Sequence, residues 1–227
     1  MTIKANCREQ LTAGDFHFLA SVLSSPSGRP ASLESLLLDP AARDAALESD
    51  RVFQAVMEST EPLPVSARLY FYVLTRHLLA EFDREISDYV ASMLAAFLDI
   101  RRMRALPGRP ETQVDYVADM LSAQASSSGD DDFHVRVHVG NWSLFVAGIF
   151  PAHLQYRATV HGAPDISFYE KVGSANYRAA SDHRLARRHA LAGVYRTMAD
   201  RFSEVRRDLN RMSDRLLCIE PAGSVLS

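Results

Sequence analysis

Hydrophobic positions recur at helical spacing along most of the chain. In the segment 86–100, apolar side chains follow one another every three or four residues, so they share one face of a helix. They are Ile86, Tyr89, Val90, Met93, Leu94, Phe97 and Ile100. The preceding segment, 66–82, is apolar almost all round, which is typical of a helix at the centre of a bundle. The short connection at Asp83 predicts that the two helices are antiparallel neighbours.

Polar residues mark the starts and ends of further helices. Thr12, Ser66 and Asp165 precede apolar-periodic segments and are expected to cap them, and Asp39-Pro40 is a similar start signal. The sequences TEPLP (60–64), LPGRP (106–110) and SSSGDDD (126–132) interrupt the pattern. Between these signals, helices are expected at 33–38, 41–48, 51–59, 112–125, 153–160 and 166–181.

The segment FHVRVHVGNWSLFVAGIFP, 133–151, carries two conflicting patterns. Its first residues alternate Val with His and Arg, which favours a β-strand. No other segment offers a convincing partner strand, and a lone strand leaves its backbone polar groups unsatisfied. As a helix the segment is apolar on both faces, and Gly140 and Gly148 allow other helices to approach closely. We therefore predict a buried helix ending at Pro151.

The last long segment has a sustained heptad pattern. Apolar residues are spaced alternately by four and three positions, as in a coiled-coil seam. They are Leu191, Tyr195, Met198, Phe202, Val205, Leu209, Met212 and Leu216. Two interpretations are open: a helix lying along a groove of its own bundle, or a self-association interface, for which the charges favour an antiparallel pairing.

These patterns predict an all-α protein. We expect a single multi-helix bundle at 66–227, with a short N-terminal helical appendage at 1–65 packed on it and a long C-terminal helix.

Composition and charge narrow the function classes. The chain has 227 residues, 47% hydrophobic and 23% charged, with a formal net charge of −3. That charge does not favour nucleic acid or anionic lipid. The longest apolar run, 142–150, is far shorter than the ~18 residues of a membrane span. Two cysteines, Cys7 and Cys218, form no disulfide framework, so we expect a cytoplasmic protein.

His134 and His138 raise the possibility of a metal site. On a helix they lie at i and i+4, a spacing at which two imidazoles can bind one ion, and Asp130, Asp131 and Asp132 are close in sequence. The chain has no HExxH motif and no ExxH pair. We therefore expect no metal site.

Several polar residues lie within strongly apolar helices and are candidates for a ligand pocket. Arg76 and His77 occur in the 66–82 helix, and a buried guanidinium there needs a partner such as Glu85, Asp88 or Glu170. Other candidates lie on the helices at 133–151 and 166–181. They are Asn141, Trp142, Tyr169, Glu170 and Tyr177, with Gly173 between the two tyrosines. Core packing and structural ion pairs are the plainer interpretation of the same residues.

No motif in the sequence names a reaction. GxSxG, Walker and GxGxxG patterns are absent. The favoured hypothesis is a non-catalytic cytoplasmic helical protein that acts by protein–protein interaction, as a homodimer or an adaptor, without a cofactor. The alternative is an enzyme or small-ligand-binding protein whose pocket lies between the helices at 66–82, 133–151 and 166–181.

Overall fold

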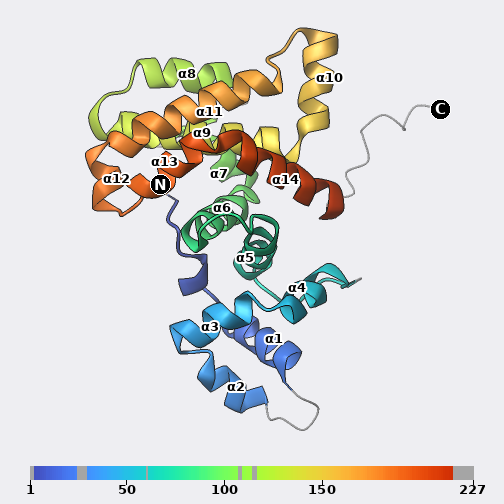
Figure 1. The fold of residues 1–227 in the computed structure, drawn as a ribbon. Helices are drawn as coiled ribbons and strands as arrows, with labels where there is room; N and C mark the ends of the chain where they lie inside the picture. The colour runs from blue at the N-terminus through green and yellow to red at the C-terminus, as the bar shows by residue number, and fades with distance from the viewer. Residues whose placement is uncertain (1–2, 25–29, 60, 107–108, 114–116, 217–227) are drawn as a thin grey trace, which may run out of the picture. The chain divides into compact units, whose positions relative to one another are not determined.

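The structure is a computed structural model, and it describes residues 3–24, 30–59, 61–106, 109–113 and 117–216. Most of these residues are helical, which confirms the predicted all-α class (Figure 1). The chain forms two compact units. Ala5–Ala95 make up the N-terminal unit, and Ala96–Ser227 with Met1–Lys4 make up the C-terminal unit. The boundary predicted at 65/66 stays a prediction.

The N-terminal unit is built from short helices, three of which start at predicted caps. In chain order they are η1 (Cys7–Glu9), α1 (Ala13–Leu23), α2 (Pro30–Leu36), α3 (Pro40–Leu47), α4 (Asp50–Met57), α5 (Ala67–Leu78) and α6 (Arg84–Phe97). Thr12 and Ser66 cap α1 and α5, and Asp39 caps α3 with Pro40 in its first turn. Asp15, which is fully buried, accepts hydrogen bonds from the backbone N–H groups of both Thr12 and Ser66. One carboxylate therefore joins the starts of α1 and α5.

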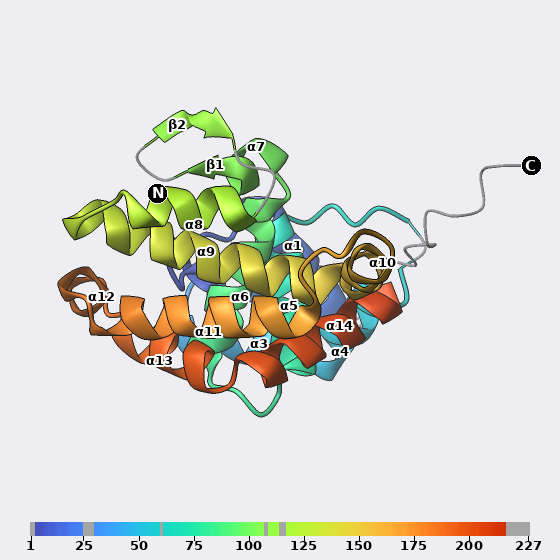
Figure 2. The same cartoon turned by 90° about the horizontal axis from the view of Figure 1, so that it is seen from above.

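The C-terminal unit is organised around α9 (Gly129–Ile149). Its other elements are α7 (Ile100–Arg104), β1 (Ala105–Leu106), β2 (Arg109–Gln113), α8 (Val117–Ala125), α10 (Pro151–His161), α11 (Ile166–Asp182), α12 (Arg184–Arg188), α13 (Ala192–Asp200) and α14 (Phe202–Leu216). Helices α8, α11 and α14 pack on α9, and α13 packs on α11 (Figure 2). Helices α10 and α12 lie at opposite ends of this unit in both views.

The segment 133–149 is helical, as predicted. It belongs to α9, and most of its side chains are buried. A Cβ placed at Gly140 would lie 3.0 Å from ring atoms of Tyr177, and one at Gly148 would lie 2.9 Å from Leu209. Both glycines therefore allow a neighbouring helix to approach, which offsets their low helix propensity.

The expected helix at 112–125 begins later than predicted. Arg109–Gln113 form a strand that pairs antiparallel with Ala105–Leu106, and α8 starts at Val117. Residues 107–108 and 114–116 lie outside the described part of the chain. Two very short strands carry no periodic pattern, so the sequence predicted only a break at 106–110.

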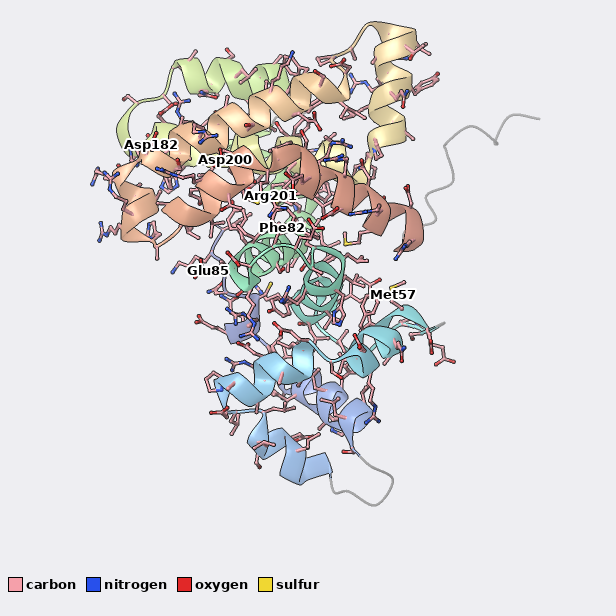
Figure 3. All side chains as sticks on the ribbon, viewed as in Figure 1. Met57, Phe82, Glu85, Asp182, Asp200 and Arg201 are labelled. Carbon is pink, nitrogen blue, oxygen red and sulfur yellow. The ribbon has the colours of Figure 1, made fainter. Side chains whose placement is uncertain are left out.

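The expected long C-terminal helix is also interrupted. Arg201, with φ −115° and ψ 25°, separates α13 from α14 (Figure 3). Ser174 on α11 donates a hydrogen bond of 2.7 Å to the carbonyl of Ala199, near the end of α13. This bond from a neighbouring helix satisfies a terminal carbonyl at the break, and the heptad pattern continues across it.

Candidate functional site

Asn141 and Tyr177 meet in the core of the C-terminal unit. The Tyr177 hydroxyl donates a hydrogen bond of 2.7 Å to Asn141 Oδ1, and both residues are buried. Tyr177 also stacks on Tyr195 of α13, with ring centroids 5.9 Å apart. A buried amide needs a hydrogen-bond partner, and here the partner comes from the facing helix. The pair fixes how α9 and α11 pack.

Trp142 and Tyr169 form a second contact between the same two helices. Their ring centroids lie 6.0 Å apart, and both belong to the apolar cluster that also contains Val117 and Met120 of α8. The sequence neighbours Asn141 and Trp142 thus have different packing partners.

Glu170 binds neither of these pairs. It forms an ion pair of 2.7 Å with Arg206 Nε, which connects α11 to α14. Both side chains are mostly buried, so this pair links two helices of the unit.

Arg76 and His77 belong to the N-terminal unit. Arg76 Nε donates to Glu48 Oε1 over 2.9 Å, and its Nη1 lies 3.4 Å from the carbonyl oxygen of Phe82. His77 Nδ1 donates to the Val73 carbonyl over 2.9 Å, and its ring stacks on Phe53. None of the three acids proposed from the sequence is the partner of Arg76. A pocket shared by Arg76, His77 and the residues of α9 and α11 stays a prediction.

The partner of Arg76 belongs to an ionic network that sequence reasoning missed. Glu48 also accepts two hydrogen bonds from Arg84, at 2.6 and 2.9 Å. These bonds, led by those from Arg84, lower the pKa of Glu48 to about 2. Asp88 instead accepts hydrogen bonds from Arg8 Nε and from the backbone N–H of Cys7. Asp44 links the two groups, because it lies 2.8 Å from Arg8 and 3.6 Å from Arg84, so three arginines face three carboxylates within the unit.

Four buried polar atoms on α9 and α11 have no hydrogen-bond partner in the described structure. They are His138 Nε2, Trp142 Nε1, Ser143 Oγ and Asn176 Oδ1. His138 is 7% exposed, and burial lowers its pKa to about 4, although a hydrogen bond to the Met103 backbone opposes this shift. Such atoms need water or a ligand group to avoid a desolvation cost.

Two of the three acidic residues near His134 and His138 bind arginines. Asp130 pairs with Arg184, and Asp132 with Arg136. Among the described residues, no group of three or more His, Cys, Asp or Glu side chains is arranged to hold a metal ion.

The heptad residues of the described part of the chain are buried. Leu191, Tyr195, Met198, Phe202, Val205, Leu209 and Met212 are each 3% exposed or less. Phe202 covers Gly173, and Leu209 covers Gly148. The side chain of Leu216 lies outside the described residues. A dimer interface built on these residues stays a prediction, and it would require them to leave their present contacts.

Helix α10, in contrast to the heptad residues, is mostly exposed. Of its 11 residues only Leu154 is buried, whereas Tyr156 is 59% exposed and Val160 is 55% exposed. Tyr156 and Val160 lie at i and i+4, so they share one face of the helix. The helix was predicted from the sequence but this face was not, although the spacing of the two apolar residues opposite Leu154 indicates it.

Comparisons with protein-family models, curated proteins and solved structures found no match. Within the described residues, no helix is both long and apolar enough to cross a bilayer. The chain's own surfaces and buried groups are therefore the basis for assigning a function.

Proposed function

We propose that this protein is a cytoplasmic adaptor that binds another protein through the outward face of α10. The observation that supports this is the pair of large apolar side chains, Tyr156 and Val160, on a helix that buries only Leu154. Single exposed apolar residues are ordinary. Two exposed apolar side chains on one face of a helix that buries only one of its own side chains form a compact docking surface. Tyrosine is also a frequent hot-spot residue in protein interfaces.

The way in which the sequence specifies both ends of α10 supports a role for this helix outside the core. Pro151 starts the helix, and Gly162 ends it in the left-handed conformation with φ 61°. A helix of this length is marginal by itself in water. The chain thus specifies both ends of a helix that contributes one buried side chain to its own unit.

The homodimer hypothesis is weaker than the adaptor hypothesis on this surface. His153 and Arg157 lie beside the apolar face of α10, and the helix carries no acidic residue. Packing α10 against a second α10 would place basic residues close to one another, which costs free energy. A heterologous partner avoids this repulsion.

Native mass spectrometry of the protein purified from its own cells tests the proposal. The intact chain should carry a protein partner, and the Tyr156→Asp/Val160→Asp double variant should lose it while keeping its helical circular dichroism. Leu38→Asp, at a residue 70% exposed in the N-terminal unit, is the matched control and should keep the partner. A partner retained equally by all three proteins would contradict the use of α10.

A second candidate function is binding of a small ligand in the C-terminal unit. It is favoured by the four unpartnered polar atoms of α9 and α11. The same spectra test it, since a bound ligand adds a constant small mass. That mass should fall in occupancy in Ser143→Ala, which removes one of the four unpartnered groups. Spectra that show the mass of the bare chain alone would remove this candidate.

A further inference from the structure

We infer that α12 is a pH-sensitive element, because its N-terminal cap is present only while His183 is neutral. The inference goes beyond the role proposed for α10, since α10 and α12 lie at opposite ends of the C-terminal unit (Figure 2). It is carried by one hydrogen bond at the junction of α11 and α12.

His183 is the residue that ends α11 and starts α12. Its backbone is extended, with φ −72° and ψ 146°, as at an ordinary N-cap. Its Nδ1 accepts a hydrogen bond of 3.2 Å from the backbone N–H of Leu185. A backbone N–H can only donate, so Nδ1 must present a lone pair, and the proton of the neutral ring must lie on Nε2.

The capping ring lies against the core of the unit. It stacks on Phe133 of α9, with ring centroids 4.9 Å apart and an angle of 21° between the planes. Leu185, which donates to the ring, is 6% exposed, and the next residue, Ala186, is fully buried. The cap therefore joins α9 to the first buried residues of α12.

Uptake of a proton reverses the role of Nδ1. Both ring nitrogens of an imidazolium carry protons, so Nδ1 would direct an N–H at the N–H of Leu185. The new positive charge would also lie beside the first backbone N–H groups of a helix, which carry partial positive charge themselves. The cap is therefore present above the pH at which His183 takes up a proton, and it is lost as pH falls through that value.

The charged groups around the junction do not compensate a protonated His183. Asp130 of α9 pairs with Arg184 at 2.6 Å, and Asp182 of α11 pairs with Arg196 of α13 at 3.3 Å. The other charged or titratable groups near the junction are Asp131, His134, Arg187, Arg188 and His189. Only one of these is acidic, so the surroundings favour the neutral, capping form of the ring.

The test follows the amide of Leu185 by NMR hydrogen exchange in the full-length protein at about pH 8 and about pH 5, on either side of the usual histidine range. Asparagine caps a helix at both pH values, so His183→Asn is the reference. The natural protein should match His183→Asn at the higher pH and exchange roughly fivefold faster than it at the lower pH. His183→Ala, which has no capping side chain, should exchange about fivefold faster than His183→Asn at both.

Two controls isolate the cap. Comparing proteins at the same pH removes the intrinsic pH dependence of exchange and the contribution of His138, which all three proteins share. The amide of Leu69 is the matched internal control, because the hydroxyl of Ser66 caps it at the same distance of 3.2 Å and does not titrate. Its exchange should be equal in the natural protein and in His183→Asn at both pH values.

A second measurement needs no variant. The ¹⁵N chemical shifts of the His183 ring report which nitrogen carries the proton, and at the higher pH they should place it on Nε2. A neutral ring with its proton on Nδ1 would overturn the inference. So would a Leu185 exchange ratio between the natural protein and His183→Asn that is the same at both pH values, or a His183→Ala variant that exchanges no faster than His183→Asn.

Discussion

At Gly173 of α11, the ring of Phe202 occupies the space where any other residue would place its Cβ atom. Gly173→Ala should therefore destabilise the protein by about 2 kcal/mol, because a methyl group would overlap a ring that is only 2% exposed. Chemical denaturation gives this free energy of unfolding.

Gly193 of α13 is the matched control for Gly173. A Cβ at this position has nothing within 4 Å. Gly193→Ala should change stability by less than about 1 kcal/mol, in the stabilising direction, because alanine is the better helix former. A Gly173→Ala variant as stable as Gly193→Ala would show that Phe202 can move aside without cost.

His138 should make stability depend on pH. In the unfolded chain a histidine titrates near pH ~6.5, whereas burial lowers the folded-state pKa of His138 to about 4. Between these values the unfolded state binds more protons, so stability falls as pH falls through this window. The loss is on the order of 3 kcal/mol, from the difference between the two pKa values.

The variant that tests this prediction is His138→Gln, which cannot titrate. Its stability should fall less than that of the natural protein between pH 6.5 and pH 4, measured by urea denaturation. His153→Gln, at an exposed residue of α10, is the control and should follow the natural protein. If the free energy of unfolding falls with pH by the same amount in all three proteins, the burial of a neutral His138 is contradicted.

At the scale of elements, Glu48 connects three helices of the N-terminal unit. It lies just after α3 and binds Arg76 of α5 and Arg84 of α6. Its folded-state pKa of about 2 lies below the ~4.3 of an unfolded glutamate. Its stabilisation is therefore present above pH ~4.3 and is lost as pH falls toward 2.

Glu48→Gln should destabilise the protein by about 2 kcal/mol at pH 7, because it leaves two arginines without their shared carboxylate. The difference from the natural protein should shrink as pH falls from 4.3 toward 2. Glu58→Gln, at an exposed residue after α4, is the control and should be nearly neutral. A Glu48→Gln effect that does not change with pH would assign the loss to packing rather than charge.

At the scale of the whole molecule, substitutions of the heptad residues and of α10 should have opposite effects on stability. Met198 is fully buried, so Met198→Asp should lower the free energy of unfolding by about 4 kcal/mol or more through an unpaired buried charge. Thermal unfolding followed by circular dichroism measures this. Tyr156→Asp should leave the melting temperature nearly unchanged. A stable, folded Met198→Asp monomer derived from a natural dimer would instead support the heptad residues as an interface between chains.

The sequence by itself determined the features that depend on neighbours along the chain. The caps at Thr12, Ser66 and Asp165 were predictable because each accepts a hydrogen bond from a residue three positions later. The helical state of 133–149 was predictable because no other segment could pair with a strand there. The all-α class follows from the repeated 3.6-residue period.

Tertiary structure decided the features that join distant segments. Arg76 binds Glu48, 28 residues earlier, and Arg8 binds Asp88, 80 residues later, and no local pattern ranks such partners. The break at Arg201 could not be predicted, because the spacing of apolar residues is the same in one long helix and in two successive helices whose apolar faces align. The burial of the heptad residues and the exposure of Tyr156 could not be predicted from the sequence either. An apolar stripe specifies that a face will be covered, whereas the helices that surround it decide whether the cover comes from the same chain or is left to a partner.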